Sequence, residues 1–247
     1  MWSFRANART ALSRFELTGP LVAPTDYRVI GNGDNWVAFK DVDGVMEFPF
    51  LAENLMPRGV ACGLVRTPAR VAPPTLSFSK SKNIVVVGLT LNSQMFHIII
   101  NGCQIVKLQG VSIIAAGNSP NTDGIHVQLS SGVTVLNSRI QTGDDCILIG
   151  PGATNLWMEK SHVAPVTHWS LGKDQNEAGV QNVTNVENPI VIHQNYCPGN
   201  KNCPDQVSGV KVSDVTYQDI HGTSVTEVAV NFDCSSKHPC SGYEWKG

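Results

Sequence analysis

The chain has 247 residues, of which 42% are hydrophobic and 15% are charged, and this composition excludes an intrinsically disordered protein. The 18 Lys and Arg residues against 20 Asp and Glu residues give a net charge of -2, so neither a nucleic-acid partner nor an anionic membrane surface is expected. No run of about 18 apolar residues occurs, so we predict no membrane-spanning helix. The length suits one large domain.

Residues 1–20 form an atypical N-terminal segment, with Arg5, Arg9 and Arg14 but only one acid, Glu16. This segment lacks the continuous apolar core of a secretory signal. Residues 21–247 are predicted to form a single domain with an irregular insert at about 46–74. The insert contains five prolines and no alternation of polar and apolar residues, which is typical of a long loop.

Five later segments are predicted to be short β-strands, because polar and β-branched residues alternate in them and Gly or Asn lies at their ends. These segments are residues 83–90, 104–112, 132–138, 154–160 and 208–216. Alignment on the first aliphatic residue of each uses Ile84, Ile105, Val133, Leu156 and Val210, and gives steps of 21, 28, 23 and 54 residues. Repeats of about 20–30 residues predict a solenoid, and we favour an all-β fold, a right-handed parallel β-helix. The alternative β-sandwich has strands at about 8–12 residue spacing and fits less well.

Acidic residues are concentrated in two motifs, Asn-Thr-Asp-Gly at 121–124 and Gly-Asp-Asp-Cys at 143–146. Asp123 and Asp144 are 21 residues apart, so a β-helix would stack them on neighbouring strands about 4.7–4.9 Å apart, with Asp145 directly following. Three carboxylates at this spacing repel one another, and at least one should hold its proton. A protonated and an ionised carboxyl are the pair that glycoside hydrolysis requires.

Two other interpretations of these motifs remain open. Asp-Gly sequences often form ordinary turns, and paired acids bind calcium. The offset of one repeat between the motifs favours a joint site over two independent turns. The Asp-Thr/Ser-Gly motif of aspartic proteases does not occur.

The seven cysteines include two close pairs, Cys197 with Cys203 and Cys234 with Cys240. Each pair brackets a short polar loop, which is typical of disulfides in secreted proteins. Two zinc half-sites are the alternative, but the spacing exceeds that of the usual ligand pair. Asn182 begins a glycosylation sequon, which is also compatible with secretion.

Taken together, the motifs resemble those of plant polygalacturonases of glycoside hydrolase family 28. The resemblance is carried by residues 118–127, 141–147 and 149–152. It extends to residues 21–28, 92–97, 188–197 and 228–234, and covers roughly 20–45, 75–175 and 180–242.

The resemblance implies a secreted cell-wall enzyme with a pectin-lyase-like β-helix. Such enzymes hydrolyse α-1,4-galacturonosyl bonds of pectin, here homogalacturonan, with inversion and without a metal or other cofactor. It implies Asp144 as general acid and Asp123 with Asp145 as the pair that activates water. Asn121 and Gly143 become candidates for substrate binding, and a monomer is expected. The usual carboxylate-distance rule associates a separation of about 5 Å with retention instead, and we follow the resemblance.

The chain also departs from the family pattern. No Gly-His-Gly motif occurs, and His168, 23 residues after Asp145, is either a substitute catalytic histidine or an ordinary surface residue. A family cysteine expected nearby is absent, which leaves Cys146 without a partner. The Arg-Ile-Lys motif that would hold the substrate carboxylate is missing, and the sequence is shortened between Gly179 and Asn188. We therefore expect a β-helix with several turns missing or disrupted, with open ends and marginal solubility.

Three functions follow in order of preference. The first is hydrolysis of pectin. The second is a catalytically impaired or inactive relic that at most binds pectin. The third is a calcium-dependent pectate lyase, which needs a metal and an arginine base near the acids. Neither acidic motif contains an arginine, and Arg139 lies four residues before Gly143.

Overall fold

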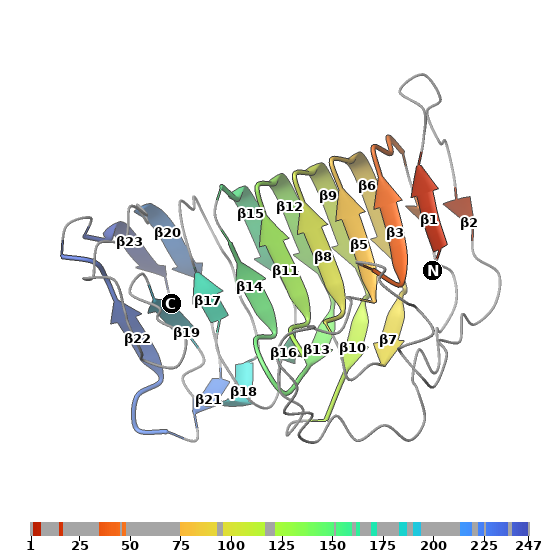
Figure 1. Ribbon diagram of the computed structural model, residues 1–247. Helices are drawn as coiled ribbons and strands as arrows, with labels where there is room; N and C mark the ends of the chain where they lie inside the picture. The colour runs from red at the N-terminus through yellow and green to blue at the C-terminus, as the bar shows by residue number, and fades with distance from the viewer. Residues whose placement is uncertain are drawn as a thin grey trace, which may run out of the picture.

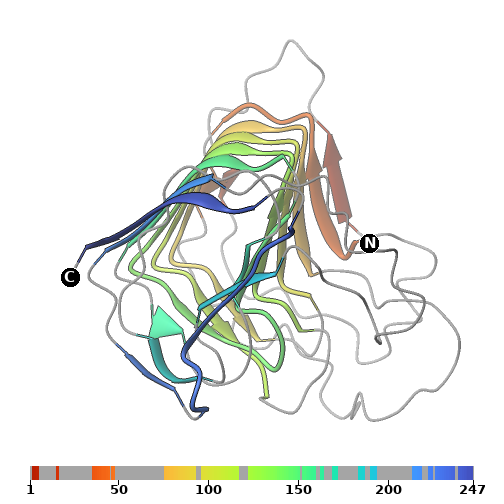
Figure 2. The same ribbon diagram turned by 90° about the vertical axis from the view of Figure 1, so that its left-hand side faces the viewer.

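The computed structural model of the chain describes residues 2–5, 15–16, 35–44, 46–47, 75–92, 96–116, 122–150, 152–159, 162–163, 169–171, 183–186, 190–193, 213–218, 222–224, 226–236 and 239–246. All regular secondary structure in these ranges is β-strand, and every strand pairing is parallel. Successive turns stack behind one another along one axis (Figures 1 and 2). The predicted parallel β-helix is therefore confirmed.

Three sheets run along the axis. Sheet A has the order β1-β3-β5-β8-β11-β14-β17-β19-β22. Its strands are Trp2–Arg5, Val37–Lys40, Leu76–Ser79, Ile98–Asn101, Ile125–Gln128, Ile147–Ile149, Trp169–Leu171, Ile190–His193 and Val230–Asp233. The first of these, β1, lies in the segment expected to be atypical and pairs with β3 as part of sheet A.

Sheets B and C form the other two faces. Sheet B contains β7 (Thr90–Asn92), β10 (Ser112–Ile114), β13 (Arg139–Gln141), β16 (His162–Val163), β18 (Val183–Val186) and β21 (Gly222–Ser224). Sheet C contains β6 (Lys82–Val87), β9 (Gln104–Gln109), β12 (Ser131–Leu136) and β15 (Thr154–Glu159). Two further pairs are β2 (Phe15–Glu16) with β4 (Met46–Glu47) and β20 (Ser213–Gln218) with β23 (Ser241–Lys246).

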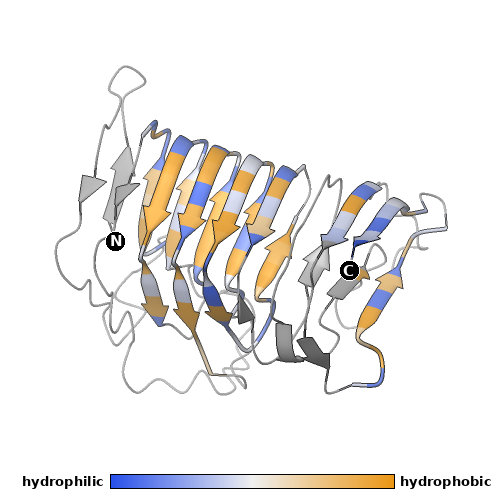
Figure 3. Cartoon of the chain, turned by 180° about the vertical axis from the view of Figure 1, so that it is seen from behind, coloured by the Kyte–Doolittle hydropathy of each residue, from blue (hydrophilic) through white to orange (hydrophobic). Residues whose placement is uncertain are grey.

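The core is built from the alternate residues of each strand that point inward. In sheet C the register aligns Ile84, Val106, Val133 and Leu156, and all four are at most 1% exposed. Figure 3 shows the resulting alternation of hydrophobic and hydrophilic bands across the strands. Each turn thus buries an aliphatic row against its neighbours, which is the main source of stability in a solenoid.

One position in the predicted repeat is wrong by a single residue. The equivalent of Ile84 in the next turn is Val106, whereas Ile105 is 64% exposed with φ of +55°. The observed steps between aligned residues are therefore 22, 27 and 23 residues. The predicted strand around Val210 begins instead at Ser213, and Val210 lies outside the described residues.

Left-handed residues form a column at the corner that opens sheet C. Asn83, Ile105, Gly132 and Asn155 occupy this corner in successive turns, with φ between +54° and +70°. Asn and Gly tolerate this conformation, whereas a β-branched residue such as Ile105 is strained there. The left-handed backbone conformation at this corner therefore recurs from turn to turn without burial of the side chain.

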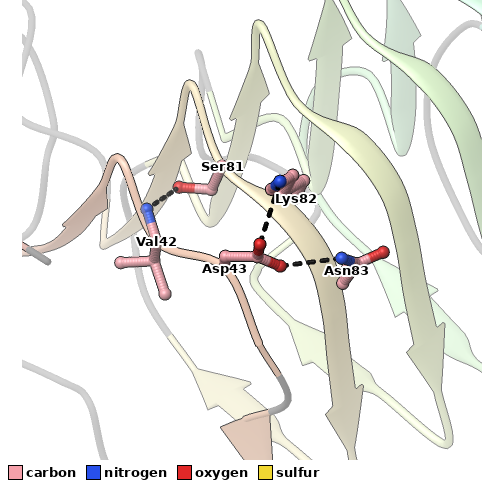
Figure 4. Close-up of polar contacts among 5 residues, drawn as sticks. All are labelled: Val42, Asp43, Ser81, Lys82 and Asn83. Atoms are coloured by element: carbon pink, nitrogen blue, oxygen red, sulfur yellow. Dashed lines mark hydrogen bonds and ion pairs between the residues drawn. The ribbon is translucent and has the colours of Figure 1, made fainter. Parts of the chain in front are cut away.

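Polar contacts join neighbouring turns at the same corner (Figure 4). The backbone N–H of Val42 donates to Ser81 Oγ at 3.1 Å, and Asp43 accepts from Asn83 Nδ2 at 2.7 Å. Lys82 Nζ lies 3.0 Å from Asp43 Oδ2. The hydrogen bond from Asn83, followed by that from Lys82, lowers the pKa of Asp43. These contacts hold turns in register where the chain leaves sheet A.

Candidate active site

The three predicted acids lie where two successive turns enter sheet A. Asp123 is two residues before β11, and Asp144 and Asp145 are three and two residues before β14. These two strands are neighbours in sheet A. The fold thus brings the two acidic motifs together along one end of the sheet.

The register makes Asp145 the equivalent of Asp123. Ile125 aligns with Ile147, and the ladder continues because the N–H of Gly124 donates to Asp145 O at 2.8 Å. The step is therefore 22 residues, where the sequence analysis assumed 21 for Asp123 and Asp144. Asp144 precedes the stacked position by one residue.

Hydroxyl groups brace the two motifs against each other. The N–H of Gly143 donates to Thr122 Oγ1 at 2.9 Å across the turns. Within the second motif, Thr142 Oγ1 donates to Asp144 O at 2.9 Å, and the N–H of Asp145 donates to Asp144 Oδ1 at 3.0 Å. The Thr122 and Thr142 side chains are fully buried, so these bonds fix the backbone that carries the acids.

A third turn contributes His97, a residue to which the sequence analysis gave no role. Its backbone N–H and its ring Nδ1 both lie 3.0 Å from the carbonyl oxygen of Asp123. Because a carbonyl only accepts, Nδ1 carries the proton in this contact. His97 is fully buried, so it anchors the Asp123 backbone from the turn before it.

Close packing next to Asp123 requires a glycine at position 124. A Cβ atom at this position would lie 2.5 Å from Cys146 O and 2.5 Å from Ile140 Cγ2. Real Cβ atoms do not approach other atoms this closely, so any larger residue would push the two motifs apart. The glycine of the Asn-Thr-Asp-Gly motif therefore sets the distance between the turns.

Burial and mutual repulsion favour the protonated forms of two acids. Burial, followed by the charge of Asp144, raises the pKa of Asp123 to about 7. Burial, followed by the charges of Asp123 and Asp144, raises the pKa of Asp145 to about 8. Among the described residues, the charged groups that contribute to these shifts are carboxylates. The expectation that at least one acid holds its proton thus has a physical basis in the structure.

Cys146, the residue after Asp145, is a buried free thiol. Its Sγ lies 3.4 Å from Thr142 Oγ1 and 3.7 Å from Ile140 O. Burial raises its pKa to about 11, so it stays a neutral thiol. By contrast, Cys234 and Cys240 form a disulfide with an S–S distance of 2.07 Å.

His126 lies on the outer face of sheet A, and its place in the first acidic motif gave no sign of a role. It follows Asp123 by three residues, and its neighbours in register are Ile99 and Leu148. Its Nε2 lies 3.2 Å from where a Cβ of Gly150 would be, so the glycine leaves room for the ring. Burial lowers the pKa of His126, which favours the neutral imidazole.

Several predicted residues fall outside the described part of the chain. These are Asn121, His168, Asn182, Cys197 and Cys203. Within the described ranges, no group of three or more His, Cys, Asp or Glu side chains has an arrangement that could hold a metal ion. The described residues also contain no candidate for a membrane-spanning helix.

Comparisons with known proteins place this chain in a family. The chain matches the family described as glycosyl hydrolases family 28 over residues 61–184 and 179–247. It is 52% identical to a polygalacturonase of Prunus persica, over 92% of this chain and 68% of that protein. It is 34% identical to a polygalacturonase of Persea americana, over 93% of this chain and 60% of that protein. The chain belongs to glycosyl hydrolases family 28.

A solved structure supports the fold independently. The polygalacturonase from Erwinia carotovora ssp. carotovora has a TM-score of 0.53 to this chain, with 15% sequence identity. The match covers 98% of this chain and 77% of that one. At this identity the likeness concerns the β-helix itself.

Proposed function

We propose that the protein hydrolyses α-1,4-galacturonosyl bonds of homogalacturonan in pectin, as a secreted cell-wall enzyme. The observation that carries the proposal is the pairing of Asp123 with Asp145 on adjacent turns, with Asp144 one residue away. Membership of the family and the named polygalacturonase relatives support the choice of substrate.

In this proposal Asp144 acts in its protonated form, gives that proton to the leaving glycosidic oxygen and is left ionised. The pair Asp123 and Asp145 activates a water molecule on the opposite face of the sugar, which inverts the anomeric centre. Because the pKa values of the pair are raised to about 7 and 8, the pair holds protons under mildly acidic conditions. Loss of one proton leaves an ionised carboxylate beside a protonated one, and this state is the water-activating form.

The absence of an Arg-Ile-Lys sequence bears on both binding and ionisation. A cation near the site would bind the substrate carboxylate and would also lower the pKa of neighbouring acids. Without that motif we expect a high KM for galacturonan. His168, Asn121 and Gly143 remain proposed contributors to catalysis or substrate binding.

The stereochemistry of the first product tests the reaction class. Proton NMR of freshly cleaved oligogalacturonate should show the β-anomer first, before mutarotation, and a chelator should leave the rate unchanged. An α-anomer would contradict the inverting mechanism. An unsaturated product that disappears with chelator would identify a calcium-dependent lyase instead.

A second candidate function is binding of pectin without hydrolysis. The missing Arg-Ile-Lys motif favours it, because three acids facing an acidic polymer lack that compensating charge. Retardation of the folded protein in a gel containing polygalacturonate, with no release of reducing ends, would support this alternative and exclude the first.

A further inference from the structure

Three side chains form a row on the outer face of sheet A. Ile99 of β8, His126 of β11 and Leu148 of β14 are direct neighbours in register, and all three are half-buried. We call them the outer row. His126 follows Asp123 by three residues, which span at most about 11 Å. A sugar polymer held at the acids can therefore place a neighbouring unit on the outer row.

His126 is the polar member of the outer row, and its ring has no protein partner. Burial is the cause that lowers its pKa, and neither a charge nor a hydrogen bond contributes. Within the part of the chain that the structure describes, no hydrogen bond or ion pair involves the ring. The imidazole is therefore neutral at about pH 7, and it offers one nitrogen that donates and one that accepts.

A glycine keeps one side of this ring open. A Cβ atom at position 150 would lie 3.0 Å from Gln128 Cβ and 3.2 Å from His126 Nε2. Gly150 does not have a positive φ, so its backbone conformation does not call for glycine. The absent side chain instead leaves space beside the imidazole.

The outer row lacks a positive charge that would hold a carboxylate. Among the residues of sheet A whose side chains the structure describes, Lys40 on β3 is the one lysine or arginine. Three strand spacings, about 14 Å, separate β3 from β11. A free galacturonate on the outer row would lose water from its carboxylate against Ile99 and Leu148 without gaining an opposite charge there, which is costly.

A methyl ester of the same sugar avoids this cost. It carries no charge, and its carbonyl oxygen accepts a hydrogen bond from a neutral imidazole. Its methyl group finds apolar surface on either side of His126, because both register neighbours are aliphatic. The outer row therefore matches the ester in charge, in hydrogen bonding and in apolar surface.

We propose that His126 is a specificity-determining residue that selects a methyl-esterified galacturonosyl unit. The imidazole N–H donates to the ester carbonyl oxygen, and the methyl group packs against Ile99 or Leu148. His126 takes no part in breaking the glycosidic bond. The inference rests on the proposed function in that the ligand is a galacturonosyl chain, and it does not require that the chain be hydrolysed.

The test compares two ligands by titration calorimetry at about pH 7, hexagalacturonate and its fully methyl-esterified form. All proteins carry Asp144→Asn, so that hydrolysis does not consume the ligand. The esterified hexamer should bind about fivefold more tightly. His126→Arg supplies a cation for the carboxylate and should reverse the preference, changing the ratio of the two affinities by about tenfold or more. His126→Gln keeps an uncharged donor and acceptor and should keep the preference for the ester.

Thr134→Arg is the matched control for added charge. Thr134 is an outward residue of β12 in sheet C, so an arginine there should change the affinity ratio by less than about twofold. Tighter binding of the free acid to the starting protein, an unchanged ratio in His126→Arg, or no binding of either hexamer would overturn the proposal. Circular dichroism shows whether each variant is folded. The predicted ratios in a protein that releases no reducing ends without Asp144→Asn would refute hydrolysis alone and leave this inference standing.

Discussion

Asp123 and Asp145 occupy equivalent positions on adjacent turns, and the N–H that follows Asp123 donates to the carbonyl of Asp145 at 2.8 Å. The two carboxyl groups are therefore held side by side by the sheet ladder itself. Burial is the largest cause of the raised pKa of each carboxyl group, and the charge of Asp123 raises the pKa of Asp145 further.

Removal of either carboxylate of the pair should abolish most of the activity. Asp123→Asn and Asp145→Asn keep the size of the side chain but remove the group proposed to activate water. We expect initial rates on polygalacturonic acid to fall by about 10²–10⁴. Asp43→Asn is the matched control, because Asp43 lies at a distant corner with Asn83 and Lys82. A fall of less than about threefold in both variants would contradict the assigned role.

Activity should increase with pH across the range where the pair ionises. The water-activating form requires one ionised member, and the two pKa values are raised to about 7 and about 8. We therefore expect kcat/KM to rise between about pH 5 and pH 7. A profile that is highest at or below about pH 5 would mean that the pair acts in its protonated form, with the roles of the three acids exchanged.

The same pKa values predict a pH-dependent effect on stability. Because the folded protein binds more protons than the unfolded chain between the ordinary and the raised pKa, its stability decreases as pH rises from about 4 to 8. Asp145→Asn removes this cost. The variant should gain on the order of 1–3 kcal/mol over the unsubstituted protein at pH 8 and little at pH 4, measured by urea unfolding. An equal gain at both pH values would show that ionisation is not the cause.

Gly124 should tolerate no side chain. Gly124→Ala places a Cβ 2.5 Å from both Cys146 O and Ile140 Cγ2, so the two motifs must separate. We expect a loss of about 1–3 kcal/mol in stability together with loss of activity. Gly132→Asn is the contrasting substitution, because Asn83 and Asn155 occupy the same left-handed corner in other turns. If Gly124→Ala has the same melting temperature and the same activity as the unsubstituted protein, the close packing of Gly124 against Cys146 and Ile140 would be contradicted.

Ile105 offers a site for stabilisation. It is 64% exposed and has φ of +55°, a conformation that disfavours a β-branched residue. Ile105→Asn should raise the free energy of unfolding by about 1 kcal/mol, as measured from the denaturant midpoint. Ile105→Val, which keeps the branch, should give no gain. A destabilised asparagine variant would indicate that the exposed side chain makes a contact that matters.

The sequence predicted the β-helix because its inward residues alternate strictly within each strand. The predicted alignment placed Ile105 in the core. In the sequence, an exposed aliphatic residue at a left-handed corner cannot be distinguished from the first core residue of a strand. The periodicity of hydrophobic residues does not report the backbone conformation of a single corner residue. Asn83, Gly132 and Asn155 at the same corner are the signal that identifies its position.

The sequence motifs identified the three acids, but they did not identify the residues that hold the backbone of these acids in place. The 21-residue spacing matched Asp123 to Asp144, but the turn between β11 and β14 is one residue longer, so Asp145 is the stacked partner. The bonds from His97 to Asp123 and from Gly143 to Thr122 join residues more than 20 positions apart. Such bonds depend on the register between turns, which becomes known only when the turn lengths are fixed.

The proposed function requires that this chain cleave homogalacturonan with its three acids. The most direct test measures release of reducing ends from polygalacturonic acid by the purified, folded protein beside the Asp144→Asn and Asp43→Asn variants. Steady release is expected from the unsubstituted protein and from Asp43→Asn, and almost none from Asp144→Asn. No release by a folded, unsubstituted protein, or equal release by Asp144→Asn, would contradict it.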